Sequence, residues 1–259
     1  MRSPIPRALA ALALLALPCA PARAWTEGFH EEAAIQAARL MPLSLQQLLA
    51  QNAGRLREGA RAPHATAGTE RQYLHAGSSY GALDQEILRQ TQRCLDLLAD
   101  RAPFSVLAYE MGVLSHLVSL AESPLHVAAD DPREPEWAAD FEGYAERKRE
   151  RFRIVFDGYL SSSLERDDVV AFVTTICDRS RRYYPVLASS YHLEDGRLAR
   201  SVTFDDRHPV FGIASLAWAR SIGDTAKLWL YIWIRAGGDT ANLPFPLGDG
   251  LRVVEGAGQ

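Results

Sequence analysis

Apolar residues recur at intervals of three and four along nearly every ordered stretch of the chain, and strict alternation over the length of a strand is hard to find. This spacing is typical of α-helices that bury one face. It predicts an all-α fold, arranged as a single helical bundle domain. The predicted helices are Phe29–Ala50 (bent or broken at Pro42), Tyr80–Leu98, Pro103–Ala121, Pro135–Tyr159 and Pro209–Ile234.

Two further stretches have distinctive patterns. Ser105–Ala121 is apolar on almost every side, which predicts a helix at the centre of the bundle. Ser162 and Glu165 have the spacing of a capping box, and the periodic apolar run Val169–Tyr191 follows them. We therefore expect a long amphipathic helix over this run.

The last helical stretch, Pro209–Ile234, carries aromatic residues at helical spacing, and these predict a core face. Arg220, Asp224 and Lys227 interrupt it, and their charges argue against a membrane span. Gly237 and Gly238 then predict the end of the helix.

The first 24 residues have a different composition. Arg2 and Arg7 frame a short basic start, the apolar run Ala8–Leu17 follows, and Ala22–Ala24 ends the segment. This order is that of a secretory signal peptide. The apolar run is about ten residues long, short of the roughly 20 that a membrane-spanning helix needs. We therefore expect cleavage before Trp25 and a periplasmic or secreted protein without a transmembrane segment.

The expected organisation is a signal peptide over 1–24, a helical domain over 25–236 and a loosely ordered C-terminal tail over 237–259. A lipoprotein signal would use Cys19, but Pro18 stands where a small residue is expected. Cleavage removes three arginines and no acid, so the formal net charge falls from −4 to −7. An acidic chain argues against a surface that coats nucleic acid, although a local basic cleft stays open as an alternative.

Two cysteines remain after this cleavage, Cys94 and Cys177, and both lie in expected helices. An oxidising compartment permits a disulfide between them, while two buried thiols are the simpler interpretation. Their positions do not have the C-x-x-C spacing of a redox or zinc site.

His116 and His126 are the first candidates for chemistry. His116 lies in the helix expected to be buried, where both nitrogens of an imidazole still need partners. The Ser-Pro-Leu-His sequence that ends at His126 breaks the helix and presents a second imidazole. A metal ion on one nitrogen and a hydrogen bond on the other would satisfy such a group, and ordinary hydrogen bonds would also do so.

Several motifs together resemble those of a known superfamily. Trp25 stands five residues before His30, the stretch Arg57–His64 follows, and Tyr73-Leu-His75 and His116-x9-His126 come next. These features are similar to those of the zinc-dependent phospholipases C and the related single-strand-specific zinc nucleases. The similarity covers most of the chain after residue 24.

The resemblance implies an all-α bundle that holds up to three zinc ions and hydrolyses a phosphodiester. It implies that the α-amino nitrogen and carbonyl oxygen of Trp25 ligate one zinc together with His30. His64, His75 and His116 would hold a second, with His64 in place of the family's aspartate. His126 and Glu142 would hold a third.

The sequence also departs from the family. The motif His-x-x-x-Asp-x-x-x-Pro-x-His has an aspartate that bridges two metals, and Leu120 stands at its position here. Ala138 stands where the histidine of the third site is expected. Glu122 is a nearby carboxylate, but two further residues turn it by about 200° around a helix, so it is a poor substitute unless the helix has already ended. The site therefore looks incomplete, and no residue is assigned as the general base.

Three interpretations remain. The chain is an active zinc phosphodiesterase with one or two metals, a catalytically degraded member that retains the fold and at most one zinc as a binding or envelope-associated protein, or an unrelated exported helical protein. If it is an enzyme, its acidic charge favours a phospholipid or another small phosphodiester over nucleic acid.

Overall fold

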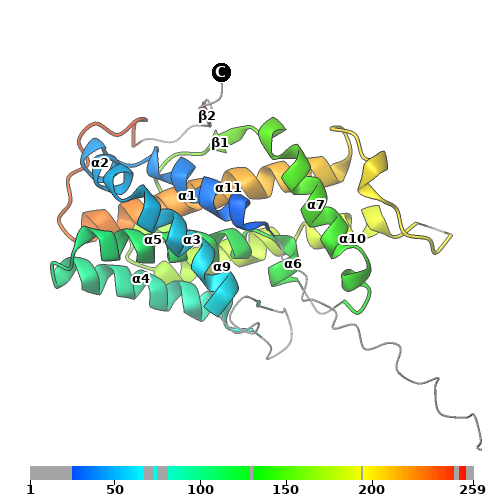
Figure 1. Ribbon diagram of the computed structural model, residues 1–259, viewed down its shortest axis with the longest axis horizontal. Helices are drawn as coiled ribbons and strands as arrows, with labels where there is room; N and C mark the ends of the chain where they lie inside the picture. The colour runs from blue at the N-terminus through cyan, green and yellow to red at the C-terminus, as the bar shows by residue number, and fades with distance from the viewer. Residues whose placement is uncertain are drawn as a thin grey trace, which may run out of the picture.

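A computed structural model describes residues 25–66, 73–74, 81–128, 131–193, 195–247 and 251–254, with the side chains of 63–66 excepted. The described residues form the mostly helical bundle that the sequence predicts (Figure 1). The longer helices are α1 (Glu27–Ala38), α2 (Leu43–Gln51), α3 (Ala53–Thr66), α4 (Leu83–Ala99), α5 (Phe104–Ala121), α7 (Ala138–Lys148), α9 (Val169–Arg181), α10 (Tyr184–Tyr191) and α11 (Pro209–Arg235).

Shorter elements connect these helices. They are α6 (Pro124–Val127), η2 (Glu134–Glu136), η3 (Arg149–Arg151), α8 (Ser162–Glu165), η4 (Ser201–Thr203) and the strands β1 (Ile154–Phe156) and β2 (Arg252–Val254). The four-residue α6 begins with Pro124, which is favoured in a first helical turn because it has no amide hydrogen to leave unpaired.

Helix α5 is the centre of the bundle, as its all-round apolar sequence predicts. It packs against α1, α3, α4 and α11, and its second half is buried without interruption from Leu114 to Ala121. By length and composition α5 could cross a membrane, but 67% of it is buried inside the structure. Its apolar character is therefore explained by its place in the core.

Two glycines bring α3 and α5 into backbone contact. A Cβ added at Gly59 would lie 1.9 Å from the carbonyl oxygen of Tyr109, and one added at Gly112 would lie 2.1 Å from that of Leu56. A larger side chain at either position would push the helices apart, because interiors are packed without spare volume. This contact sets the distance between the helices that carry two of the candidate histidines.

The predicted helix Pro135–Tyr159 is wrong at its C-terminal end. Helix α7 ends at Lys148, a single 3-10 turn follows, and Phe152 has an extended backbone. β1 then pairs antiparallel with β2, so that Val155 lies opposite Val253. A three-residue strand is too short to show alternation, and β2 comes from the segment expected to be a loosely ordered tail.

The predicted capping box is also wrong. Ser162 and Glu165 form the separate short helix α8, and α9 is capped by Asp168, whose carboxylate accepts from the amide of Ala171 at 2.9 Å. The expected run to Tyr191 is divided into α9 and α10, because Pro185 cannot donate the amide hydrogen that a continuous helix would need.

The remaining predictions of helices are close to the structure. α1 and α2 are separated at Pro42, and α11 is followed by Gly237 with a φ of +79°, a conformation that glycine adopts without strain. The proposed signal peptide lies outside the described residues, and its boundary stays a prediction.

Candidate functional site

Trp25 is held in the core directly before α1. Its indole ring stacks on Phe29 with centroids 3.9 Å apart, and its Nε1 donates to the carbonyl oxygen of Ser119 at 3.1 Å. The next residue, Thr26, caps α1 and donates to a carboxylate oxygen of Glu146 at 2.6 Å. The start of α1 is thereby fixed to both α5 and α7.

The structure brings His30 and His116 together. Both side chains are fully buried, and their rings stack with centroids 3.8 Å apart and an interplanar angle of 24°. His30 is on α1 and His116 is one turn before Leu120 on α5. Trp25, through Ser119, reaches the same turn of α5. These three candidate residues therefore form one cluster.

The ring of His116 is oriented by α3. Its Nδ1 lies 2.8 Å from the carbonyl oxygen of Ala60. Since a carbonyl oxygen only accepts, Nδ1 carries the hydrogen, and Nε2 is the basic nitrogen of the neutral ring. Metal-binding histidines are commonly oriented in this way, with the second nitrogen donating to a backbone carbonyl.

His126 is buried on α6 beside the segment that precedes His75 in the sequence. The ring of His126 stacks on Tyr73 with centroids 4.4 Å apart, and its carbonyl oxygen accepts from the amide of Leu74 at 2.8 Å. Tyr73 is itself fixed by the amide of Leu83, which donates to its carbonyl oxygen at 3.1 Å. Tyr73 and Leu74 therefore meet the Pro-Leu-His motif at this point.

Two candidate ligands cannot be placed. His75 and the side chain of His64 lie outside the described residues.

Glu142 is half-buried on α7, next to Phe141, whose ring contacts Trp25 at a centroid distance of 6.0 Å. Ala138 is on the same helix and is buried.

The described residues do not by themselves form a zinc site. Among them, no three His, Cys, Asp or Glu side chains converge as a ligand set. Two imidazoles on one tetrahedral zinc have ring centres about 5 Å apart, because each Zn–N bond is about 2.0–2.1 Å. The stacked rings of His30 and His116 are closer than this. As placed, these two rings therefore do not ligate the same zinc ion.

Leu120, which stands where the sequence resemblance expects a bridging aspartate, is fully buried. Glu122 does not replace that carboxylate. It is at the C-cap of α5, where it forms an ion pair with Arg179 of α9. The helix has ended at this position, and the ion pair with Arg179 is what directs the Glu122 side chain toward α9.

Glu122 belongs to a buried charged cluster that the sequence analysis missed. Nη2 of Arg179 contacts both Glu122 and Asp224, and Nζ of Lys227 lies 3.1 Å from Asp224 and 2.7 Å from Asp157. In the sequence, this cluster is indicated only by Asp224 and Lys227, which lie three residues apart on one face of an otherwise apolar helix. The cluster joins α5, α9 and α11.

The two buried carboxyl groups of this cluster differ in their pKa. Burial and the charge of Asp224 raise the pKa of Glu122 well above its usual range. Lys227 and Arg179 together outweigh burial at Asp224 and lower its pKa. Asp224 has two cationic partners and Glu122 has one, so the cluster favours the ionised form of Asp224 more than that of Glu122.

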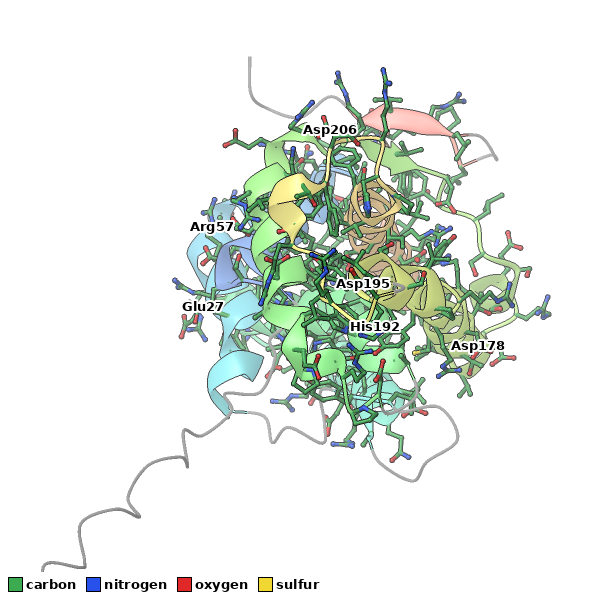
Figure 2. The ribbon with its side chains drawn as sticks, turned by 90° about the vertical axis from the view of Figure 1, so that its right-hand side faces the viewer. Glu27, Arg57, Asp178, His192, Asp195 and Asp206 are labelled. Carbon is green, nitrogen blue, oxygen red and sulfur yellow. The ribbon has the colours of Figure 1, made fainter. Side chains whose placement is uncertain are left out.

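Two other histidines lie apart from the candidate cluster. His192 ends α10, and Figure 2 shows it with Asp195 on the segment that faces the viewer. His208 caps α11 by accepting from the amide of Val210 at 3.3 Å, and burial lowers its pKa. The capping contact gives His208 a structural role, and the ring of His192 packs edge-on against Trp137 with centroids 6.3 Å apart.

This chain is similar to known proteins in its fold and not in its sequence. No family model matches the chain, and no curated protein matches it in sequence. Solved structures do match. The fold resembles that of the clostridial alpha-toxins.

Two of these structures are representative. Alpha-toxin from an avian strain of Clostridium perfringens has a TM-score of 0.61 and 13% sequence identity, over 82% of this chain and 64% of the toxin chain. Alpha toxin from Clostridium absonum has a TM-score of 0.61 and 12% identity, over 83% of this chain and 67% of the toxin. The chain thus spans just under two thirds of the first toxin, and identities this low show the shared fold alone.

Proposed function

We propose that this protein is an exported phosphodiester hydrolase of the phospholipase C type that works with one or two zinc ions. The observation that carries the proposal is the cluster of Trp25, His30 and His116, which joins the start of α1 to the middle of the bundle. The all-α phospholipase C fold supports it independently of the residues. Phospholipid is the proposed substrate class, with other small phosphodiesters as the alternative.

The proposed roles follow from the environment of each residue. Nε2 of His116 is presented as a ligand because Nδ1 is fixed on Ala60. His30 would serve a second ion with the α-amino nitrogen and carbonyl oxygen of Trp25, once residues 1–24 are removed. His64 and His75 would complete the ion on His116, and His126 with Glu142 would hold a third if one binds.

Zinc at these residues would offset the charge of a phosphodiester and lower the pKa of water. The protein's own contribution is to exclude solvent and to orient the imidazoles. His30, His116 and His126 are all buried, and each ring lies against another ring or a backbone carbonyl. This rigid environment favours rings that are oriented before a metal binds.

The experiment measures zinc per chain and hydrolysis of phosphatidylcholine by the chain that begins at Trp25. We expect about one or two zinc ions per chain and a rate that chelation abolishes and zinc restores. His116→Ala should lower both. His192→Ala is the matched control, because it removes an imidazole outside the cluster.

A second candidate function has its own observation. The buried Leu120 favours a degraded protein that retains the fold and binds lipid or another partner without hydrolysis. Zinc below about half an ion per chain together with no hydrolysis would overturn the enzyme proposal and support this one. Leu120→Asp should then raise the zinc content. Leu114→Asp, on another side of α5, is its control.

A further inference from the structure

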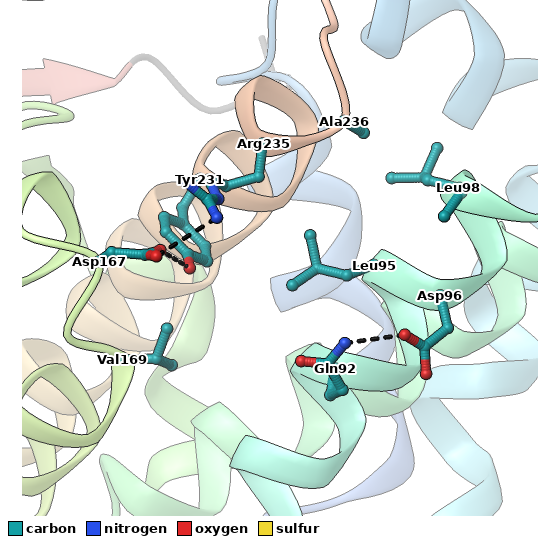
Figure 3. Close-up of a pocket in the computed structure, with 10 residues that line it drawn as sticks. Gln92, Leu95, Asp96, Leu98, Asp167, Val169, Tyr231, Arg235 and Ala236 are labelled. Carbon is teal, nitrogen blue, oxygen red and sulfur yellow. Dashed lines mark hydrogen bonds and ion pairs between the residues drawn. The ribbon is translucent and has the colours of Figure 1, made fainter.

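A pocket lies at the opposite end of the α4–α5 hairpin from the histidine cluster. It has a volume of about 520 Å³ and is formed by the second half of α4, the turn between α8 and α9, and the C-terminal end of α11 (Figure 3). Small-molecule sites have volumes of about 300–1,000 Å³. The start of α5 is about 18 Å from His116 along the helix axis, at about 1.5 Å per residue. The pocket is therefore separate from the proposed hydrolytic site.

One wall of the pocket is a closed polar network. The carboxylate of Asp167 accepts from the hydroxyl of Tyr231 on one oxygen and pairs with Arg235 at 3.3 Å on the other. Burial and Asp167 raise the pKa of Tyr231 to about 12, so this hydroxyl stays protonated as the donor. The charge of Asp167 is offset by Arg235.

The facing wall carries a carboxylate with a different kind of partner. Asp96 accepts from the side-chain amide of Gln92 at 2.8 Å, and this contact orients it without supplying charge (Figure 3). Among the residues that the structure describes, no lysine or arginine forms an ion pair with Asp96. The pocket thus has two carboxylates and one guanidinium, and its net charge is negative.

Apolar side chains lie between the two walls. Leu95 stands between the Asp167–Tyr231 pair and the Gln92–Asp96 pair in Figure 3, and Leu98 and Val169 also line the pocket. A ligand that fits this lining has an apolar body and one positive charge. The apolar part would cover Leu95 while the charge lies against Asp96.

We propose that this pocket binds a small organic cation with an apolar body, with Asp96 as its counter-charge and Leu95 as its apolar contact. The proposal is independent of the hydrolytic function, because no pocket residue belongs to the histidine cluster. An anion is disfavoured by the net negative charge, since the guanidinium of Arg235 is already engaged with Asp167.

The test titrates the chain that begins at Trp25 with benzyltrimethylammonium and follows the backbone amide shifts by NMR. Benzyl alcohol and benzoate serve as neutral and anionic probes with the same ring. We expect saturable shifts at Leu95, Val169 and Tyr231 with the cation, weaker shifts with the alcohol and none with benzoate.

Asp96→Asn is the decisive variant, because it keeps the shape and removes the charge. Loss of one exposed ion pair weakens binding by about fivefold or less. We therefore expect the Asp96→Asn variant to bind the cation about three- to fivefold more weakly than the unmodified protein. Asp100→Asn removes the same charge from the end of the same helix without lining the pocket, and should change affinity little. Equal binding of all three probes, shifts confined to the histidine cluster, or an unchanged affinity in Asp96→Asn would each overturn the proposal.

Discussion

Nδ1 of His116 lies 2.8 Å from the carbonyl oxygen of Ala60, and this contact exists because the backbones of α3 and α5 touch. Gly59 precedes Ala60 directly, so the close approach and the hydrogen bond occur on the same turn of α3. The orientation of a candidate metal ligand therefore depends on a residue that has no side chain of its own.

Gly59→Ala should separate α3 from α5 and weaken the hydrogen bond to His116. The new Cβ would lie 1.9 Å from the carbonyl oxygen of Tyr109, and overpacking of this kind costs about 1–3 kcal/mol or more. Gly54→Ala is the control on the same helix. Its Cβ would meet nothing within 4 Å, and alanine should add roughly 0.5 kcal/mol of stability. Urea unfolding measures the change in unfolding free energy for both variants. Equal changes would contradict the close approach of α3 and α5 at Gly59.

Arg179→Met should be strongly destabilising. It leaves Glu122 and Asp224 buried without their shared guanidinium, and breaking a buried ion pair from one side costs about 3–5 kcal/mol. Arg197→Met removes an exposed pair with Asp195 and should cost about 0–1 kcal/mol. A shift in the urea midpoint that is similar for both variants would show that the cluster does not hold the helices together.

Glu122→Gln should change how stability depends on pH. The folded state raises the pKa of Glu122, so it binds a proton that the unfolded chain releases above about pH 4.5. The stability that this bound proton contributes is complete below the pKa of Glu122 in the unfolded chain. It is lost as the pH rises toward the pKa of Glu122 in the folded state, by about 1.4 kcal/mol for each unit of difference between the two pKa values. Asp224 acts in the opposite direction and only at acid pH. Its pKa is lowered in the folded state, so protonation of its carboxylate at low pH removes stability.

Unfolding free energies measured from pH 4 to pH 8 test this. Glutamine retains the neutral, hydrogen-bonding form, so the variant should gain stability relative to the unmodified protein as the pH rises. A difference between the two proteins that does not vary over this range would mean that Glu122 is charged in the folded state.

The two cysteines should be unreactive thiols in the native protein. Both are free and buried, burial raises the pKa of both, and that of Cys177 reaches about 12. The thiolate is the reactive form, so a thiol reagent should react slowly with the folded protein and with both cysteines after unfolding in guanidinium without a reductant. No thiol detected after unfolding would instead indicate a disulfide.

The sequence predicted helices best where the apolar pattern was long. α5 and α11 agree closely with their predicted ranges, because a run of two or more turns on one face is a strong signal. The region from Phe152 to Tyr159 was missed because its strand is three residues long and depends on a partner almost a hundred residues away. Local patterns do not contain that pairing.

The candidate site was predictable only in part and for a similar reason. The resemblance named Trp25, His30 and His116, and the structure places them in one cluster. The charged cluster around Arg179 was not found, since Glu122, Arg179 and Asp224 are far apart in the sequence and no local pattern pairs them. Only the packing of α9 against the end of α5 shows that Glu122 and Asp224 are buried together.

Leu120 has a consequence for the thermodynamics of the protein. A buried leucine contributes to the free energy of folding by itself, whereas an ionised carboxylate at the same place would need a cation to remain inside the core. With leucine, the centre of the bundle is stable whether or not zinc is present. With aspartate, folding would be linked to zinc concentration, and a chelator would lower the melting temperature. A leucine at this position therefore makes the stability of the core independent of any metal.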